Sequence, residues 1–183
     1  PLVPGNPRLG VPLTGIGKIM AIGFNYVNHA AEMAVELPTE PLLFMKATSA
    51  LTGPFDDVIQ PRNGNKLDYE SELVVVIGKR APLGPYLVGR DNIEDPQNLS
   101  IWSEVNGEMR QQGNTADMVF GVAQIVSHLS QFMTLYPGDV IFTGTPAGVG
   151  DGMTPPTYLK PGDVVRVGIE GLEAQRQTIV APR

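Results

Sequence analysis

The chain has 183 residues, enough for one domain with its own hydrophobic core. A net charge of −6 and a pI near 4.8 argue against nucleic acid or an anionic membrane as a partner. Because the sequence has no cysteine, disulfides, thiolate metal sites and cysteine nucleophiles are excluded. No apolar stretch approaches the ~20 residues of a membrane helix, so a cytoplasmic protein is expected.

The sequence opens with PLVPGNPRLGVPLTG, where four prolines and three glycines are typical of a linker. Pro1 stands where an initiator Met is expected. We therefore interpret residues 1–17 as a linker from a missing N-terminal region, and residues 18–183 as the domain.

Short strands dominate the first half of the expected domain. The apolar run from Lys18 to Gly23 predicts a strand. Asn25 or Asn28 is then expected to cap a short helix that runs from His29 to Met33. From residue 38 to residue 61, apolar patches alternate with turn residues and predict strand and loop.

The second half adds strands and one longer helix. An Asn-Gly pair at 106–107 predicts a hairpin within residues 100–112. The segment GVAQIVSHLSQFM predicts an amphipathic helix from the spacing of its apolar residues, which are Val122, Ile125, Val126, Leu129, Phe132 and Met133. In both LYPGDVIFTGT and LKPGDVVRVGI, Pro-Gly predicts a type II turn with a strand after it. Two strands are expected around Gly171, so the fold class is mainly β with a few helices (α+β).

Three carboxylates alternate along DYESELVVVIG. On a strand, Asp68, Glu70 and Glu72 would line one face, ahead of an apolar run. Carboxylates so placed repel one another unless a cation lies between them, and oxygen ligands favour Mg²⁺, Mn²⁺ or Ca²⁺. The alternative is a solvated edge strand whose charge deters aggregation.

The two histidines differ in their surroundings. His29 and Glu32 would share one helix face, an arrangement suited to a general base that deprotonates water, or to an ordinary exposed pair. His128 falls near the apolar face of the predicted longer helix and is interpreted as structural.

The glycine-rich stretch TGTPAGVG, residues 143–150, follows a predicted strand. Its backbone N–H groups and the hydroxyls of Thr143 and Thr145 suit a carboxylate or an oxyanion; the alternative is a tight turn. It lacks the lysine of a phosphate-binding loop, so a nucleotide is not favoured.

In combination and order, these segments resemble the fumarylacetoacetate hydrolase family, especially bacterial members that act on sugar-derived 2,4-diketo-3-deoxy acids such as rhamnonate and fuconate derivatives. The motifs that carry the resemblance are IGFNYVNHAAEM, FMKATSALTGP, DYESELVVVIGK, VNGEMRQQGNTADMVF, LSQFMTLYPGDVIFTGTPAGVG and YLKPGDVVRVGIEGL. The resemblance runs from about Lys18 to Gln177.

The resemblance implies a mixed β-roll or β-sandwich catalytic domain, a homodimer and a divalent cation, commonly Mg²⁺. Its site residues, carried over by motif, are Glu70 and Glu72 as metal ligands, His29 with Glu32 as the water-activating pair on a lid, and Thr145 and Lys46 as substrate contacts.

The sequence departs from the family pattern after VIGKRA. Some fifty residues are expected between Ala81 and Pro82, including a third metal carboxylate and an active-site lysine, and here the two residues adjoin. We interpret this junction as a seam across an omitted segment.

The implied activity is metal-dependent hydrolysis of a C–C bond in a 2,4-diketo acid, giving pyruvate and a carboxylic acid. The alternatives are an oxaloacetate-type decarboxylase or keto acid tautomerase, a ureidoglycolate lyase-like enzyme, and a non-catalytic β domain that binds a small acid.

Overall fold

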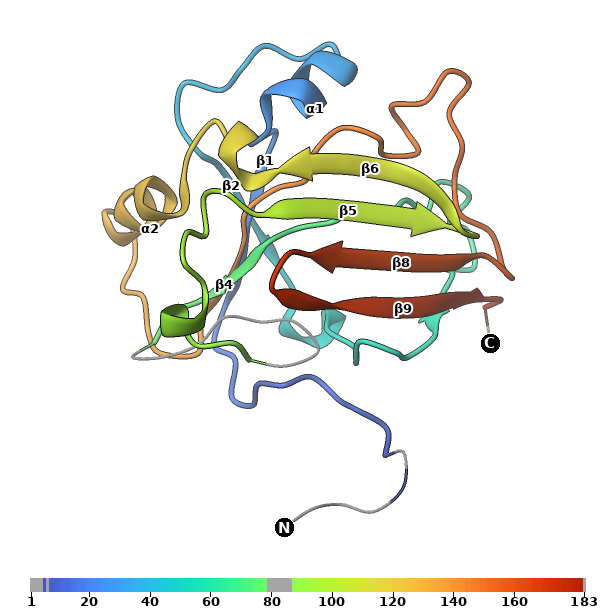
Figure 1. Cartoon of the computed structure of the whole chain (residues 1–183), viewed down its shortest axis with the longest axis horizontal. Coiled ribbons are helices and arrows are strands. Elements are labelled where there is room, and N and C mark those ends of the chain that lie inside the picture. Colours follow the sequence, from blue (N-terminus) through green and yellow to red (C-terminus); the bar gives the residue numbers. More distant parts are fainter. Residues whose placement is uncertain (1–4, 6, 79–86, 183) are drawn as a thin grey trace.

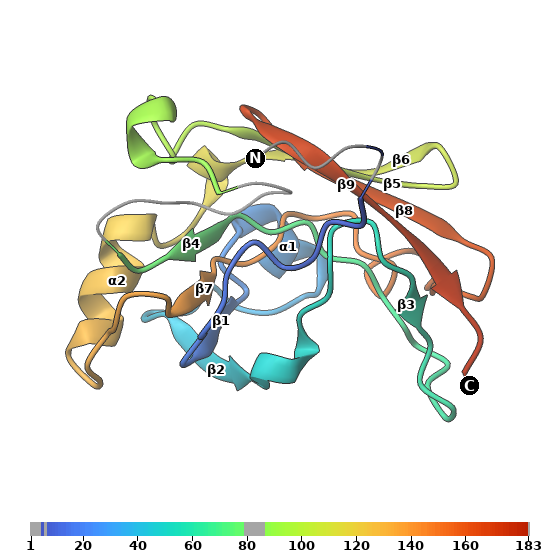
Figure 2. The same ribbon diagram turned by 90° about the horizontal axis from the view of Figure 1, so that it is seen from below.

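Two β-sheets face each other in the computed structural model of this chain (Figure 1, Figure 2). It describes residue 5 and residues 7–78 and 87–182. The first sheet has the order β2-β1-β7-β4, with the bounds Leu42–Lys46, Ile19–Gly23, Val140–Phe142 and Val74–Val76. The second has the order β3-β9-β8-β5-β6, with the bounds Val58–Ile59, Leu172–Val180, Val164–Ile169, Ser100–Val105 and Glu108–Asn114.

The two sheets differ in strand direction. In the first, β1 pairs antiparallel with β2 and parallel with β7, so this sheet is mixed. In the second, β6, β5, β8 and β9 form an antiparallel series, and β3 joins β9 in parallel. The mainly β fold with mixed sheets that the sequence predicts is therefore confirmed.

Two α-helices accompany the sheets, α1 (Val27–Glu32) and α2 (Val122–Ser130). From α2, Ile125 and Leu129 lie one turn apart and pack into a core with residues of β1 and β7. Burying each such side chain contributes about 1.5–3 kcal/mol. The predicted amphipathic helix is confirmed, but it ends at Ser130, and Phe132 beyond it is 67% exposed.

The described residues also include three 3-10 turns, with the bounds Thr48–Ala50 (η1), Arg90–Asn92 (η2) and Thr115–Asp117 (η3). Within the described ranges, no helix has the length and apolar character needed to cross a membrane. The predicted seam between Ala81 and Pro82 lies outside the described residues.

The predicted turns are confirmed by their backbone angles. Asn106 and Gly107 join β5 to β6 with φ of 54° and 82°, as a type I′ hairpin requires. Gly138 and Gly162 have φ of 95° and 98°, which suits the third position of a type II turn. Strands β7 and β8 begin just after these two glycines, as expected.

The predicted cap of the short helix is wrong. Tyr26 is the N-cap of α1 and makes no side-chain cap bond. Asn25 is fully buried, and its amide instead donates to the carbonyl oxygens of Thr143 (2.8 Å) and Phe120 (3.0 Å). Asn28 lies inside the helix. Instead of capping the helix, Asn25 attaches the start of α1 to segments that are distant in sequence.

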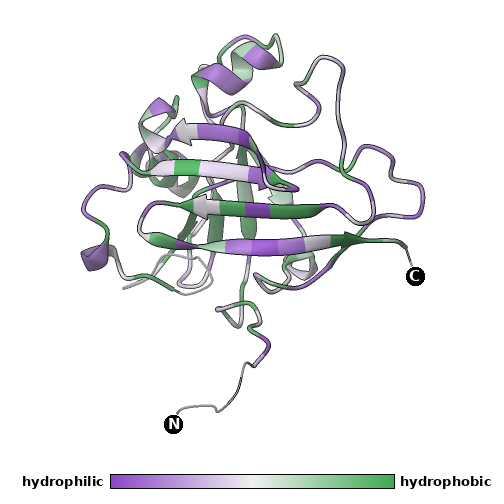
Figure 3. Cartoon of the chain, turned by 45° about the vertical axis from the view of Figure 1, so that its right-hand side comes forward, coloured by the Kyte–Doolittle hydropathy of each residue, from purple (hydrophilic) through white to green (hydrophobic). Residues whose placement is uncertain are grey.

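Polar and apolar strands are distributed unevenly (Figure 3). Strand β6 and the middle of β9 are hydrophilic, whereas the strands of the first sheet behind them are largely hydrophobic. From the hydrophilic middle of β9, Gln175 and Gln177 line a space that is also lined by residues of β4 and β7.

Candidate functional site

The acidic segment from Asp68 to Leu73 is extended, but it does not form the predicted strand. Strand β4 begins only at Val74. Side chains of the glycine-rich loop bind this segment, because Thr143 Oγ1 donates to the Leu73 carbonyl and Thr145 Oγ1 to the Ser71 carbonyl, each at 2.9 Å. Thr143 N also donates to the Leu73 carbonyl at 3.1 Å. The segment is thus attached to the loop by side chains together with a backbone bond.

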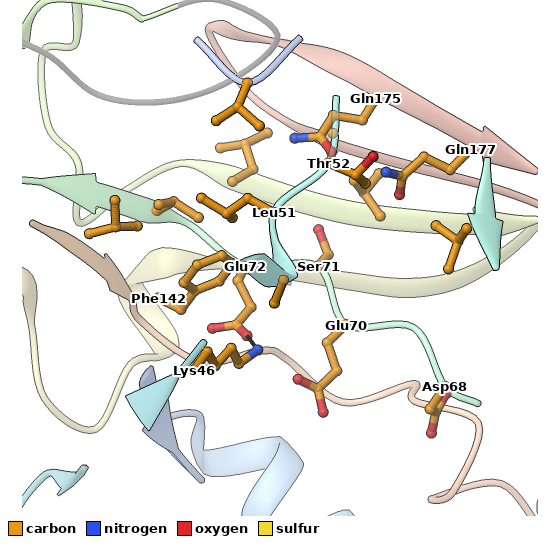
Figure 4. A pocket seen from close by; sticks show the side chains of 18 of the residues that line it. Lys46, Leu51, Thr52, Asp68, Glu70, Ser71, Glu72, Phe142, Gln175 and Gln177 are labelled. Carbon is orange, nitrogen blue, oxygen red and sulfur yellow. Dashed lines mark ion pairs between the residues drawn. The ribbon is translucent and has the colours of Figure 1, made fainter. Parts of the chain in front are cut away.

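The alternation expected for the three carboxylates is present. Figure 4 shows Asp68, Glu70 and Glu72 on the same side of the segment, while Ser71 points the other way. Tyr69 and Ser71 are buried, at 6% and 1% exposed. Burial of the intervening residues therefore turns the carboxylates toward one space.

That space is a cavity of about 880 Å³ between the two sheets. Lys46, Glu70 and Glu72 lie on one wall. The opposite wall carries the polar side chains of Thr52, Gln175 and Gln177 (Figure 4). Three of the residues predicted to form the site are therefore brought together.

Glu72 is the most strongly perturbed acid of this cavity. Its side chain is 7% exposed, and Oε2 accepts a hydrogen bond from Gly144 N at 2.6 Å. Burial, and then repulsion from Glu70, raise the pKa of Glu72 to about 7, although Lys46 and the Gly144 amide lower it. Lys46 Nζ lies 3.9 Å from Glu72 Oε1.

The pair of Glu70 and Glu72 fits a hard divalent cation, since two carboxylates that repel each other are stabilised by a cation between them. Within the described part of the chain, no cluster of three or more His, Asp or Glu side chains suits a metal ion. These two residues would supply two carboxylate ligands to such a cation, which would need further oxygen donors.

Lys46, at the end of β2, is held beside this pair. Its ammonium lies 4.8 Å from the centre of the Phe142 ring and 5.9 Å from that of Phe44. The two rings and Glu72 place a cation at the cavity wall, where it suits the carboxylate of a small acid.

His29 and Glu32 form the predicted pair on α1. His29 Nδ1 lies 3.3 Å from Glu32 Oε2, and the imidazole stacks on Phe24 with ring centres 5.7 Å apart. Glu32 is held in turn by Gly148 N, at 2.9 Å from Oε1. Among the described residues, neither His29 nor Glu32 lines the cavity. The glycine-rich loop links this pair to the cavity wall, because it binds Glu32 through Gly148 N and Glu72 through Gly144 N.

Thr145 lies behind the acidic segment. It is 4% exposed, and its hydroxyl both donates to Ser71 and accepts from Gln111 Nε2 at 2.7 Å. The structure thus gives this hydroxyl two protein partners, and its contact with substrate stays a prediction.

Sequence reasoning missed Gln111. It is fully buried, and its Oε1 accepts from Ser71 N and Ser103 Oγ while its Nε2 donates to Thr145 Oγ1 and the Pro146 carbonyl. Only the alternation along polar strand β6 could have signalled a buried amide. His128, on α2, packs edge-on against Phe132 at 4.9 Å between ring centres, as suits a structural residue.

Comparison with known proteins shows the family to which this chain belongs. The sequence model "Fumarylacetoacetate (FAA) hydrolase C-terminal" matches residues 18–82 and 79–180. A 2,4-didehydro-3-deoxy-L-rhamnonate hydrolase of Sphingomonas sp. (strain SKA58) is 44% identical over 224 residues, which cover 98% of this chain and 79% of the relative. This alignment is longer than the 183-residue chain, so the relative carries residues that this chain lacks.

Solved structures share the fold. A fumarylacetoacetate hydrolase from Exiguobacterium antarcticum superposes with a TM-score of 0.85 at 33% identity, covering 99% of this chain and 81% of that one. A 5-carboxymethyl-2-hydroxymuconate delta-isomerase from Mycobacterium smegmatis gives 0.80 at 28% identity, covering 96% and 83%. The chain therefore belongs to the fumarylacetoacetate hydrolase family, as its motifs predict.

Proposed function

We propose that this enzyme hydrolyses a C–C bond of a 2,4-diketo acid and releases pyruvate and a second carboxylic acid. One observation supports this proposal above the others. A single glycine-rich loop binds both Glu72, from the acidic pair, and Glu32, from the His–Glu pair. Ligands for a cation and a general base are thereby held by the same short stretch of backbone.

Glu70 and Glu72 would hold the divalent cation, Mg²⁺ by preference and Mn²⁺ or Ca²⁺ as substitutes. When bound, the cation polarises the 2-oxo group of the substrate. Lys46, beside Glu72, suits the 1-carboxylate of the same substrate.

His29 acts as the general base. With Nδ1 facing Glu32, Nε2 is free to take a proton from water, and the water oxygen then bonds to the 4-carbonyl carbon. The C3–C4 bond breaks, its electron pair stays on C3, and the proton held by His29 returns there. One water is consumed, so the products are pyruvate and the acid derived from C4.

The polar wall of Thr52, Gln175 and Gln177 supports a hydroxylated, sugar-derived tail on the substrate. Amide and hydroxyl groups both donate and accept hydrogen bonds, as sugar hydroxyls require. The named Sphingomonas relative acts on such an acid, for which the second product would be lactate.

A panel of 2,4-diketo acids assayed with Mg²⁺ for pyruvate release tests the proposal. Glu70→Gln should abolish turnover without lowering the unfolding midpoint measured in EDTA, since Glu70 is an exposed side chain whose charge repels Glu72. Glu104→Gln, at an acid on the second sheet, is the control that keeps activity. Undiminished turnover in EDTA would contradict the proposed metal dependence.

A second candidate is decarboxylation or tautomerisation of a keto acid, favoured by the likeness to the Mycobacterium smegmatis isomerase. These reactions need no attack by water, so His29→Ala should spare them and stop hydrolysis. The third candidate is a binding domain without catalysis, which should release no pyruvate from any acid of the panel. A metal-dependent enzyme should show a higher melting temperature in Mg²⁺, and the absence of this increase would favour the binding domain.

We also propose that the residues present in the relative and lacking here belong between residues 81 and 82 and carry the third metal carboxylate. A chain that includes them should bind Mg²⁺ at least tenfold more tightly by calorimetry. A homodimer and a cytoplasmic location stay predictions, to be checked by sedimentation and by cell fractionation.

A further inference from the structure

The glycine-rich loop (residues 143–150) and the two residues after it present backbone N–H groups to three carboxylates, two from the acidic segment and one from α1. One N–H binds Glu72 at 2.6 Å and another binds Glu32 at 2.9 Å. The third acceptor is Asp68, to which the proposed function assigns no role. Backbone N–H groups aimed at carboxylates are strong, charge-assisted donors.

Asp68 uses both of its carboxylate oxygens within the protein. Oδ1 accepts from Gly150 N at 2.7 Å and from Tyr69 N at 2.8 Å, and Oδ2 accepts from Asp151 N at 2.7 Å. Glu70, two residues along the same face, is instead an exposed side chain in the cavity. Asp68 therefore binds the loop, whereas Glu70 is available to a ligand.

The loop follows a path that leaves little freedom around its Gly148. This residue has φ of 105°, and a Cβ there would collide with the carbonyl oxygen of Arg110. Tyr69 OH donates to the Gly148 carbonyl at 2.9 Å. Asp68 precedes this tyrosine in the sequence. Two adjacent residues therefore hold the loop at two points, Tyr69 at the Gly148 carbonyl and Asp68 at the Gly150 N–H.

Both points follow directly after the N–H that binds Glu32. Gly148 donates to Glu32, and Gly150 to Asp68, only two residues further on. A Cβ at Gly152 would collide with the Glu32 side chain, so the loop also packs directly against this acid. A displacement of the loop near Gly150 must therefore disturb the hydrogen bond and the packing contact that hold the Glu32 side chain.

We propose that Asp68 is a positioning residue for the general base. Through Gly150 and Asp151 it holds the loop where the Gly148 N–H fixes Glu32, and Glu32 in turn orients His29. This role rests on the proposed function, because it matters to turnover only if His29 activates water. Asp68 does so without touching substrate or cation.

Asp68→Asn is the direct test, since the amide keeps one carbonyl acceptor and turns an NH₂ group toward a backbone N–H. We expect hydrogen exchange at Gly148, and also at Gly150 and Asp151, to become about tenfold faster. Asp95→Asn is the matched control, because Asp95 accepts a backbone N–H from Gln97 in a different loop. Exchange at Gly148 that stays unchanged in Asp68→Asn would overturn the role of Asp68.

Kinetics give a second readout that a purely structural residue would not move. In the Asp68→Asn variant, kcat should fall about ten- to a hundredfold, while KM and Mg²⁺ affinity stay within about twofold. In a Glu32→Ala background the same change should lower kcat less than about twofold, since its target is gone. Equal losses in both backgrounds, or weakened Mg²⁺ binding, would overturn the proposal.

Failure of the proposed function would give a different result. If the unaltered enzyme releases no pyruvate, the proposed function is wrong, and the exchange experiment still decides whether Asp68 holds Gly148.

Discussion

Lys46 Nζ lies 3.9 Å from Glu72 Oε1 and joins the end of β2 to the acidic segment ahead of β4. Among the described residues, Lys46 is the cation that lowers the pKa of Glu72. Burial and the charge of Glu70 raise this pKa, and the net result is a pKa of about 7. Whether Glu72 is ionised near neutral pH therefore depends in part on a lysine from β2, a strand distant in sequence.

Lys46→Met should raise the pKa of Glu72 further, because it removes the attraction of the ammonium and leaves burial and Glu70 opposed only by the Gly144 amide. Since a cation needs the ionised carboxylate, the pH at which Mg²⁺ binding is half complete should move upward. Calorimetric titrations across the pH range measure this midpoint. Lys66→Met, at a lysine that packs on Tyr158, is the control. A downward shift would contradict the assignment.

Glu72 should make the metal-free enzyme less stable as the pH rises. Between about pH 4.5 and 7 the folded protein keeps a proton at Glu72 that the unfolded chain releases, because the folded pKa is raised above 4.5. The free energy of unfolding therefore falls across this window. Glu72→Gln should remove the slope and add about 3 kcal/mol at pH 8 in EDTA, as measured by urea denaturation. A Gln variant less stable than the parent at pH 8 would refute this.

Asp139 should act in the opposite sense at acid pH. Burial raises the pKa of this carboxyl, but hydrogen bonds from Lys18 Nζ at 2.5 Å and Tyr136 N at 2.7 Å outweigh it, so the pKa lies below 3.8. Its stabilisation is present above the unfolded pKa and is lost as the pH falls through the folded one. Asp139→Asn should lower the free energy of unfolding by about 2 kcal/mol at pH 7 and reduce its dependence on pH in the acid range, as measured by urea denaturation. Asp91→Asn, at an exposed turn, should do neither.

Gly148 tests whether the path of the glycine-rich loop is essential. Gly148→Ala adds a Cβ against the Arg110 carbonyl at a φ of 105°, and it should both destabilise the fold by about 3 kcal/mol and abolish turnover. Gly162→Ala is matched in φ, at 98°, but its Cβ meets no atom within 4 Å. It should cost only about 1 kcal/mol, the strain of the backbone alone. Equal effects at both sites would mean that the close approach is unimportant.

The local chemistry of turns and strands was readable from the sequence. Asn106–Gly107 and the Pro-Gly pairs gave correct turn types, since backbone angles depend on the residues that adopt them. The carboxylate face of Glu70 and Glu72 and the i,i+3 pairing of His29 with Glu32 followed from simple periodicity.

What failed depended on partners distant in sequence. Asn25 looked like a helix cap, but its partners Phe120 and Thr143 lie 95 and 118 residues away. Asp68 lies on the predicted face of the acid row, but the sequence suggested no role for it, and its oxygens accept from a loop 82 residues later. No local pattern encodes such contacts, because they arise only when the sheets pack.

The cavity has two walls of different construction. Glu70 and Glu72 stand on backbone that Thr143, Thr145 and Gln111 fasten in place, so a shift of one residue would break several bonds at once. Gln175 and Gln177 alternate along an ordinary ladder of β9, where side chains can be exchanged without moving the main chain. New substrate preferences can therefore evolve on the β9 wall while the reaction chemistry on the facing wall is inherited unchanged.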